Sequence, residues 1–119
     1  MRTTQSRLLL VEGAEALGIV VDVTQREMVD GLVKQVKDRF GRIDVLVNNA
    51  GMSPLYGKLS DVTEAMFDKV VGVNLKGPYR LSALIGERMA DGDGGSIINI
   101  SSVAAANPAP HAEPYGAAK

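Results

Sequence analysis

The fold is decided by the stretch IDVLVNNAG, residues 43–51. Four of its first five residues are apolar, and two asparagines, an alanine and a glycine follow at once. Consecutive apolar residues are typical of a strand covered on both faces, as in a parallel sheet. Ligands bind outside the carboxyl ends of the strands in open parallel sheets. The small and polar residues that end this stretch are therefore the first candidates for a site.

A helix and an earlier strand are predicted ahead of this stretch. Residues 19–23, with the sequence IVVDV, form a β-branched run that predicts a strand. The sequence TQRE that follows has the spacing of a capping box, in which Thr24 accepts from a free backbone N–H and Glu27 reaches back. Apolar side chains then recur at helical spacing as far as Phe40, and Gly41 is a typical left-handed helix stop.

A second helical stretch and a third strand are predicted after it. The helix begins near Asp61, where DVTE again has capping-box spacing, and extends to Ala90 before DGDGG breaks it. The sequence IINI, residues 97–100, predicts a strand. We interpret residues 7–17 as the last turns of an amphipathic helix and residues 103–114, with three prolines, as a loop. Alternating strands and helices predict an α/β fold with a parallel sheet and right-handed crossovers.

Composition restricts the classes of function. The 119 residues are treated as one domain, because single cores usually span about 100–150 residues. A formal net charge of −1 removes the long-range attraction that nucleic acid or an anionic membrane would need. The chain has no cysteine and one histidine, so disulfides, thiolate metal sites and paired-histidine zinc motifs are excluded and no metal site is predicted. No stretch approaches the roughly 18 apolar residues of a membrane span. The longest apolar run near the N-terminus, residues 8–11, is shorter than the roughly 7–15 residues of a secretory core, and we expect a cytoplasmic protein.

Small or polar residues follow all three predicted strands. Asp22 and Val23 end the first, residues 48–51 follow the second, and Ser101 and Ser102 follow the third. Because the carboxyl ends of parallel strands meet at one edge of a sheet, these residues are expected to form one continuous rim. The alternative for any single strand end is that asparagine and glycine only make turns.

The last five residues add a possible acid/base pair. Tyr115 and Lys119 are four residues apart, so they lie on one face of the chain if this segment is helical. An ammonium beside a phenol favours the phenolate, and such a tyrosine can exchange a proton with an alcohol or carbonyl oxygen. A solvent-exposed helix face also produces this spacing, so the pair is weak evidence by itself.

Taken together, these residues resemble the short-chain dehydrogenase/reductase family. The resemblance runs from about Leu17 to Lys119, with a serine thirteen residues before the tyrosine and a lysine four residues after it. The positions that carry it are Asp22, Val23, Asn48, Asn49, Ala50, Gly51, Asn74, Ser102, Tyr115 and Lys119. The resemblance implies a Rossmann-like, doubly wound parallel sheet, of which residues 1–119 form a central, partial domain.

The resemblance also implies a reaction, which is reversible hydride transfer between a nicotinamide nucleotide and an alcohol/ketone pair. Tyr115 resembles the family's general acid/base, and Ser102 resembles the donor that holds the substrate oxygen, with Ser101 one position off the spacing. Lys119 resembles the group that stabilises the phenolate and binds the nicotinamide ribose. Asn74 matches the asparagine whose backbone helps to hold a water in the proton relay.

The cofactor contacts come from the same comparison. Asp22 and Val23 resemble contacts of the adenine, and Asn49, Ala50 and Gly51 resemble the wall beside the adenine ribose. The resemblance also counts Tyr115 and Lys119 among the cofactor contacts, and Lys119 resembles the residue that binds the nicotinamide ribose. Asn48 resembles a brace between neighbouring strand ends. The cofactor is expected to be NAD or NADP, and the partner a small alcohol or ketone.

The residues around Asn74 give a local physical reason for its role. Pro78 lies four residues later and has no N–H, so it cannot donate to the Asn74 carbonyl, and Gly77 weakens the same turn. We therefore predict a kink in the second helical stretch that leaves this carbonyl free to accept from water. The alternative is that Pro78 marks a boundary between two helices.

The chain also departs from the family's pattern. No G-x-x-x-G-x-G or G-x-G-x-x-G turn occurs, although such a turn places the pyrophosphate on a helix N-terminus. Family members usually run to roughly twice this length, and in their sheet order two strands lie between those predicted at residues 19–23 and 43–47. We expect an oxidoreductase in the full-length parent, a homo-oligomer through the helical stretch at residues 61–90. The competing interpretation is a catalytically inactive truncated product or an interaction module.

Overall fold

The computed structural model describes residues 13–119. The helix interpreted at residues 7–17 lies outside the described residues up to position 12, and residues 13–17 belong to no helix. Within the described part of the chain, no helix is both long and apolar enough to cross a membrane.

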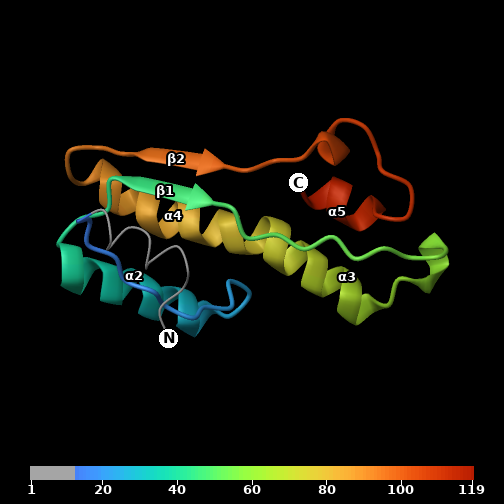
Figure 1. Ribbon diagram of the computed structural model, residues 1–119, viewed down its shortest axis with the longest axis horizontal. Helices are drawn as coiled ribbons and strands as arrows, with labels where there is room; N and C mark the ends of the chain where they lie inside the picture. The colour runs from blue at the N-terminus through green and yellow to red at the C-terminus, as the bar shows by residue number, and fades with distance from the viewer. Residues whose placement is uncertain (1–12) are drawn as a thin grey trace.

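The elements alternate as the sequence predicts from the first described helix onward (Figure 1). In chain order they are α2 (Arg26–Phe40), β1 (Val45–Asn48), the 3₁₀ turn η1 (Leu59–Asp61), α3 (Glu64–Val71), the π-helical segment η2 (Gly72–Lys76), α4 (Gly77–Ala90), β2 (Ser96–Asn99), the 3₁₀ turn η3 (Val103–Ala105) and α5 (Glu113–Ala118). The loop predicted at residues 103–114 therefore contains one 3₁₀ turn and ends in the first residues of α5.

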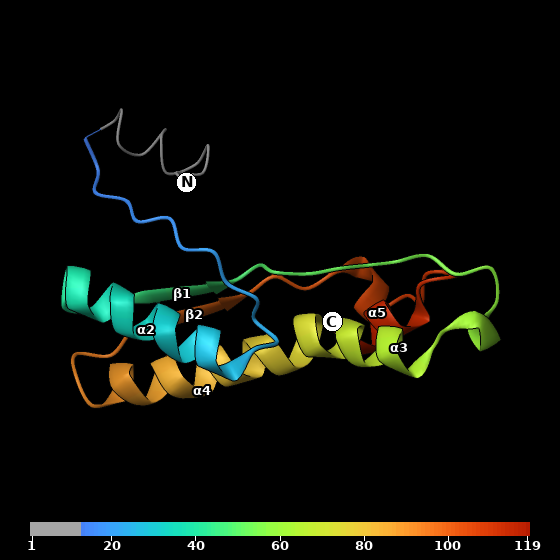
Figure 2. The same ribbon diagram turned by 90° about the horizontal axis from the view of Figure 1, so that it is seen from below.

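The two strands form a parallel pair with a simple register. Val45 lies opposite Ser96 and Asn48 lies opposite Asn99, so both strands end at the same edge. In the two ribbon views α4 covers one face of this pair, and α2 runs beside it (Figures 1 and 2). The fold is α/β with a partial parallel sheet, as the sequence predicts.

The core lies between α2, α4 and the face of β1 that points toward them. Val29 and Val33 of α2 pack with Leu81, Ile85 and Met89 of α4, and all five are buried. The buried side chains of each helix recur at four-residue intervals, which places them on one helix face. Leu46 of β1 packs against the same cluster, so the core fixes the distance between β1 and α4.

The strand predicted at residues 19–23 is absent, and this prediction is wrong for the described structure. These residues form a coil, with Val20 exposed to 86%. A strand is held by hydrogen bonds to a neighbouring strand, and the two-stranded sheet of residues 13–119 places none beside this segment. Residues 19–23 therefore have strand-forming side chains but no neighbouring strand within the described residues.

Both predicted capping boxes are also wrong. Helix α2 begins after Gln25, one residue beyond Thr24, and has no side-chain cap. The Thr24 hydroxyl donates to Asp22 Oδ1 at 2.7 Å and accepts from Gln25 Nε2 at 3.3 Å. Helix α3 begins after Thr63, whose hydroxyl accepts from the Met66 N–H at 3.2 Å, whereas Asp61 lies in η1. Thr63 is a standard N-cap residue, so the cap lies two residues further along the same DVTE sequence than predicted.

The predicted interruption of the long helix is confirmed as the π-helical segment η2. The Gly77 N–H donates to the Gly72 carbonyl five residues back, whereas Pro78 has no N–H to donate. Gly77 is also needed for space, since a Cβ there would lie 2.9 Å from Val23 Cγ2 and 3.1 Å from the Val23 carbonyl oxygen. Whether the Asn74 carbonyl accepts from water stays a prediction.

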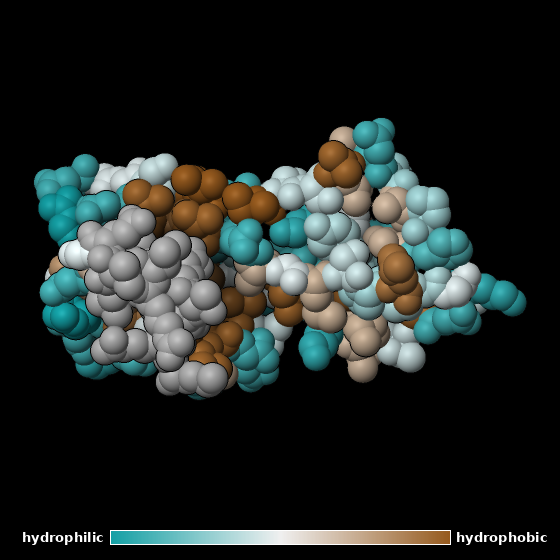
Figure 3. Space-filling model, viewed as in Figure 1, coloured by the Kyte–Doolittle hydropathy of each residue, from teal (hydrophilic) through white to brown (hydrophobic). Residues whose placement is uncertain are grey.

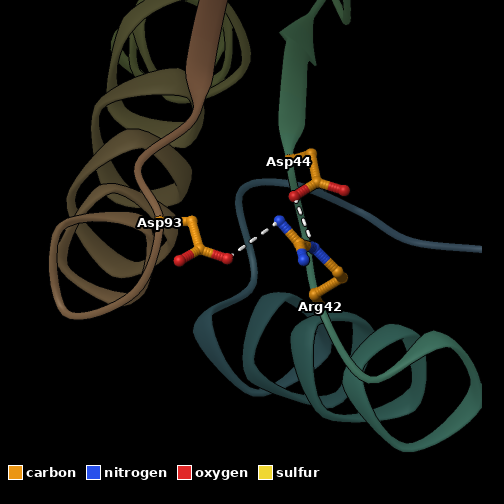
Figure 4. A network of polar contacts seen from close by, with 3 residues as sticks. All are labelled: Arg42, Asp44 and Asp93. Atoms are coloured by element: carbon orange, nitrogen blue, oxygen red, sulfur yellow. Dashed lines mark hydrogen bonds and ion pairs between the residues drawn. The ribbon is translucent and has the colours of Figure 1, made fainter.

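The amino-terminal end of the strands is joined by an exposed ion-pair network (Figure 4). Arg42 Nε lies 2.7 Å from Asp44 Oδ1, and another guanidinium nitrogen lies 3.5 Å from Asp93 Oδ2. Arg42 thus links the connection between α2 and β1 to the one between α4 and β2. All three side chains are more than half exposed, so each contact is a weak surface ion pair.

Candidate active site

The carboxyl ends of the two strands enclose a small hollow next to α5. Its volume is about 280 Å³. The parallel register brings the residues after β1 beside those after β2, and the Ile100 N–H continues the ladder by donating to the Asn48 carbonyl at 3.0 Å. The lining residues come from these two strand ends and from α5: Asn49, Gly51, Met52, Ser53, Ile100, Ser101, Tyr115 and Lys119.

Tyr115 and Lys119 reach this hollow from one short helix. The predicted helical turn is present, with the Lys119 N–H donating to the Tyr115 carbonyl at 3.0 Å. The Lys119 ammonium donates to the Ile100 carbonyl at 2.7 Å, and the Ser101 hydroxyl donates to the Lys119 carbonyl at 3.2 Å. Within residues 13–119 the phenol and the ammonium share no hydrogen bond, so the end of β2 fixes the lysine.

Gly51 leaves room for this lysine. A Cβ at position 51 would lie 3.1 Å from Asn74 Oδ1 and 3.4 Å from Lys119 Nζ. Residues 51, 74 and 119 are thus in mutual contact range, although they come from a loop, a π-helical segment and α5. Three of the predicted site positions are therefore brought together.

The side chain of Asn74 holds the loop that follows β1. Its Nδ2 donates to the Met52 carbonyl at 2.8 Å and to the Val70 carbonyl at 2.9 Å, while its Oδ1 accepts from the Met52 N–H at 3.2 Å. Asn74 is only 5% exposed, so these bonds form away from water. The prediction assigned Asn74 a backbone role, and the structure adds a side-chain role that fixes Met52 beside Gly51.

Asn48 ties the strand ends to α4, as the resemblance implies for a brace. One carboxamide nitrogen donates to Asn99 Oδ1 at 2.8 Å and to Ser82 Oγ at 3.0 Å. The residue is 6% exposed, and its Oδ1 has no partner within the described residues. Buried amides with two definite partners fix one relative position of β1, β2 and α4.

The two serines after β2 lie in different surroundings. Ser102 Oγ accepts from the Ala104 N–H at 3.2 Å and caps η3, and the residue is half-buried. Ser101 lines the hollow with Tyr115 and Lys119. The role of Ser102 as the substrate-oxygen donor stays a prediction, and Ser101 is the serine that the described arrangement places at the lysine.

Asp22 and Val23 lie apart from this hollow. Asp22 is exposed, and its Oδ1 accepts from the Thr24 hydroxyl at 2.7 Å and from the Thr24 N–H at 2.9 Å. These two hydrogen bonds lower the pKa of Asp22 below its ordinary value. Val23 shares a second, apolar hollow with Asn49 and Ala50. The structure thus gathers Val23, Asn49 and Ala50 in one place and leaves Asp22 at the surface.

Sequence reasoning missed three contributors, which are Ser82, Asn99 and the Ile100 carbonyl. Asn99 had a readable signal, because an asparagine ends each of the apolar runs VLVN and IIN, and parallel register then sets the two amides opposite each other. Ser82 lies 34 residues from Asn48, and a backbone carbonyl leaves no trace in composition. No sequence signal identifies Ser82 or the Ile100 carbonyl.

The parallel sheet has a helix on one face, and polar groups and a Tyr–Lys pair lie at the carboxyl ends of its strands. This arrangement is typical of the nucleotide-binding class of α/β proteins. The short chain dehydrogenase family model matches residues 3–119. The chain belongs to the short-chain dehydrogenase/reductase family.

Individual relatives agree with this assignment. The chain is 37% identical over 108 residues to dehydrogenase/reductase SDR family member 4 of Pongo abelii, which covers 91% of this chain and 39% of that relative. A metagenomic short-chain oxidoreductase solved in complex with NADP has a TM-score of 0.90 and 36% identity, covering 96% of this chain and 52% of that one. An NAD⁺-bound xylitol dehydrogenase has a TM-score of 0.88 and 32% identity, covering 96% and 44%. The chain spans about two fifths to one half of the length of these relatives.

The residues present fit one end of a dinucleotide. Lys119 and Asn49 offer hydrogen-bonding groups that suit ribose hydroxyls, and Gly51 has no side chain to obstruct the hollow. No G-x-G-x-x-G or G-x-x-x-G-x-G turn occurs in the sequence to hold a pyrophosphate. The hollow thus offers groups that would suit ribose hydroxyls, and the sequence contains no glycine-rich turn of the kind that holds a pyrophosphate.

Proposed function

We propose that this chain is the catalytic segment of an NAD(P)-dependent oxidoreductase that interconverts an alcohol and a ketone. The observation that carries the proposal is the hollow in which Tyr115 and Lys119 meet Asn49 and Gly51 at the carboxyl ends of two parallel strands. Family membership supports the reaction class. The relatives' cofactors, NADP in one and NAD⁺ in another, leave the choice of nucleotide open.

In this proposal each residue has a defined task. The nicotinamide, when bound, accepts or supplies the hydride. Tyr115 Oη gives a proton to the substrate oxygen during reduction and takes it back during oxidation, and the Ser102 hydroxyl donates to the same oxygen. Lys119 binds ribose hydroxyls, and its positive charge stabilises the phenolate. Asn74 holds Met52 and thereby keeps the loop at residues 49–51 beside the nucleotide.

The hydrogen-bond donors of the Lys119 ammonium have separate partners in this proposal. The ammonium has three N–H donors, and one is used on the Ile100 carbonyl. Two donors remain for the ribose and for water. We propose that this carbonyl, fixed in turn by the Ile100 N–H bond to Asn48, sets the position of the lysine during the reaction.

The sharpest test is a chimera. Residues 13–119 replace the matching segment of the NADP-bound metagenomic relative, which then supplies the remainder of the nucleotide site. We expect NADPH-dependent ketone reduction, and we expect Tyr115→Phe to lower kcat about 10²–10⁴-fold, the usual contribution of a positioned acid or base. A folded chimera whose activity survives Tyr115→Phe would contradict the assignment.

A second candidate is that residues 1–119 by themselves are a catalytically inactive truncated product or an interaction module. The absent glycine-rich turn favours it. Titration of the chain with NADH and NADPH, followed by nucleotide fluorescence, separates the two possibilities. We expect no saturable binding. Saturable binding to either nucleotide by this chain would overturn the inactive alternative.

We also propose that the parent protein is a homo-oligomer that associates through the helical stretch at residues 61–90. Three large apolar side chains of this stretch are exposed, which are Phe67, Leu75 and Tyr79. Exposed apolar side chains on a surface helix often pack against a partner. The cytoplasmic location likewise stays a prediction from the sequence.

A further inference from the structure

Gly72 and Gly77 are the two ends of the π-helical hydrogen bond of η2, and neither has a backbone conformation that requires glycine. The Gly77 N–H donates to the Gly72 carbonyl. Gly72 has φ −57° and ψ −50°, and Gly77 has φ −60° and ψ −56°, which are helical values open to any residue. Alanine is more favourable than glycine in a helix interior. The reason for glycine at these two positions therefore lies in the space beside them.

Both glycines face the turn at residues 22–25, which precedes α2, and neither contact leaves room for a methyl group. A Cβ at position 77 would lie 2.9 Å from Val23 Cγ2 and 3.1 Å from the Val23 carbonyl oxygen. A Cβ at position 72 would lie 3.1 Å from Thr24 Cγ2. Both glycines are buried, whereas the hydrophobic surface on the face drawn in Figure 3 gathers over the two strands. Val23 and Thr24 thus pack directly on the backbone of η2, inside the molecule.

The turn that packs on these glycines is fixed by its own hydrogen bonds. The Gln25 N–H donates to the Asp22 carbonyl at 3.0 Å, and Asp22 Oδ1 accepts from the Thr24 N–H at 2.9 Å and from the Thr24 hydroxyl at 2.7 Å. Residues 22–25 therefore move as one unit, and a displacement of Val23 or Thr24 also displaces the Asp22 carboxylate. Asp22 and Val23 are the two residues that resemble contacts of the adenine.

The segment η2 is held firmly on its other contacts. Asn74 lies between the two glycines, and its side chain makes three hydrogen bonds, to the Val70 carbonyl and to both backbone groups of Met52. Helices α3 and α4 continue η2 at its two ends. A methyl group added at position 72 or 77 is therefore expected to displace the turn and to leave Asn74 in place.

We propose that Gly72 and Gly77 are positioning residues for the nucleotide, because their missing side chains set the distance between η2 and the turn at residues 22–25. Through Asn74, η2 also holds the loop after β1, which resembles the wall beside the adenine ribose. The two glycines thereby set the separation between the adenine contacts and this wall. This role rests on the proposed function, with the adenine lying at the turn as the resemblance implies.

Nucleotide kinetics in the chimera that carries residues 13–119 test this role. We expect Gly77→Ala to raise the KM for NADPH about tenfold or more, because the added methyl group must push the Val23 backbone away. The KM for the ketone is expected to stay unchanged, since the turn lies apart from the hollow at the strand ends. Gly86→Ala is the matched control, because a Cβ there would lie at an ordinary 3.5 Å from Ile97 Cδ1, and it is expected to change neither KM. A Gly77→Ala variant that lowers kcat and leaves the KM for NADPH unchanged would contradict the role.

A rescue pair separates this contact from a general loss of stability. Gly72→Ala is expected to raise the KM for NADPH about threefold to tenfold, because its Cβ meets only the methyl end of Thr24. Adding Thr24→Ser removes that methyl group and keeps the hydroxyl that donates to Asp22, so we expect the KM to return to the parent value. A double variant whose KM for NADPH stays as high as that of Gly72→Ala would overturn the proposal. This pair also decides the question if Gly77→Ala does not fold.

Measurements on the chain itself test the contact without any activity. In Gly72→Ala we expect the carbon-13 signal of the Asp22 carboxyl to shift, while the Met52 amide exchanges hydrogen at the parent rate because Asn74 stays in place. An unshifted Asp22 signal, or faster exchange at Met52, would overturn the proposal even where the chimera is active. If the parent chimera binds NADPH but reduces no ketone, the proposed reaction is wrong. The same changes in the NADPH dissociation constant, followed by nucleotide fluorescence, then support the role of the glycines, and unchanged constants overturn it.

Discussion

The two ends of the strand pair are joined by different kinds of interaction. At the carboxyl end, Asn48 and Asn74 make hydrogen bonds at 5–6% exposure. At the amino end, Arg42 makes ion pairs in which every partner is more than half exposed. Water competes weakly with the first and strongly with the second. The difference indicates that the carboxyl end is built for fixed geometry, which is the end where the candidate site lies.

The largest expected effect comes from Asn48→Leu. It removes the buried donor of two part-buried hydrogen bonds, to Asn99 and Ser82, each worth about 0.5–1.5 kcal/mol, so we expect a loss of about 1–3 kcal/mol in the free energy of unfolding. Urea unfolding followed by circular dichroism measures it. Asn49→Leu, at the exposed neighbouring position, is the control and is expected to change stability by less than about 0.5 kcal/mol. Equal losses at both positions would contradict the assignment of this stability to the Asn48 hydrogen bonds.

The next effect is expected from Asn74→Asp. The carboxylate keeps an acceptor for the Met52 N–H but cannot donate to the Met52 and Val70 carbonyls, so we expect a loss of about 1–2 kcal/mol. Hydrogen exchange gives a local measurement, because the Met52 amide is expected to exchange faster while the Ile100 amide is unchanged. Uniform acceleration at both amides would show that Asn74 supports the whole fold and not this loop.

A smaller effect is expected at the amino end. Arg42→Gln removes both ion pairs, to Asp44 and Asp93, and we expect a loss of about 0–1 kcal/mol at low salt. At 1 M salt the variant and the parent are expected to be equally stable, because exposed charges are screened. Unfolding at two salt concentrations measures this. A loss as large as that of Asn48→Leu, persisting in high salt, would contradict the contrast drawn here.

The smallest expected effect is a change in the pKa of Asp22. Asp22 precedes α2 and is exposed, yet the Thr24 hydroxyl and N–H lower its pKa. A lowered pKa in the folded chain means that this residue favours folding above its ordinary pKa and that the benefit is lost as the pH falls through the folded value. Carbon-13 titration of the carboxyl is expected to give a midpoint below the ordinary value and closer to it in Thr24→Val. An unchanged midpoint in that variant would exclude the hydroxyl as the main cause.

Local chemistry explains why some elements are predictable. The runs at residues 43–47 and 97–100 form strands because each also has the other beside it, and Pro78 breaks the helical ladder wherever the helix packs. Residues 19–23 have an equally strong strand pattern and form none, since pairing depends on a neighbour. Thr24 is not the cap because α2 begins one residue later, after Gln25, and the Thr24 hydroxyl accepts from the Gln25 side chain and not from a helix N–H.

The sequence by itself determined the α/β order of elements, the interruption near Asn74 and the residue types at the strand ends, because these follow from periodicity and backbone chemistry within a few residues. Tertiary structure alone decided that Asn74 holds Met52, that the Ile100 carbonyl holds Lys119 and that Asn48 links Asn99 and Ser82. Each of these contacts joins residues 19 or more positions apart, and the register of packed elements sets such distances.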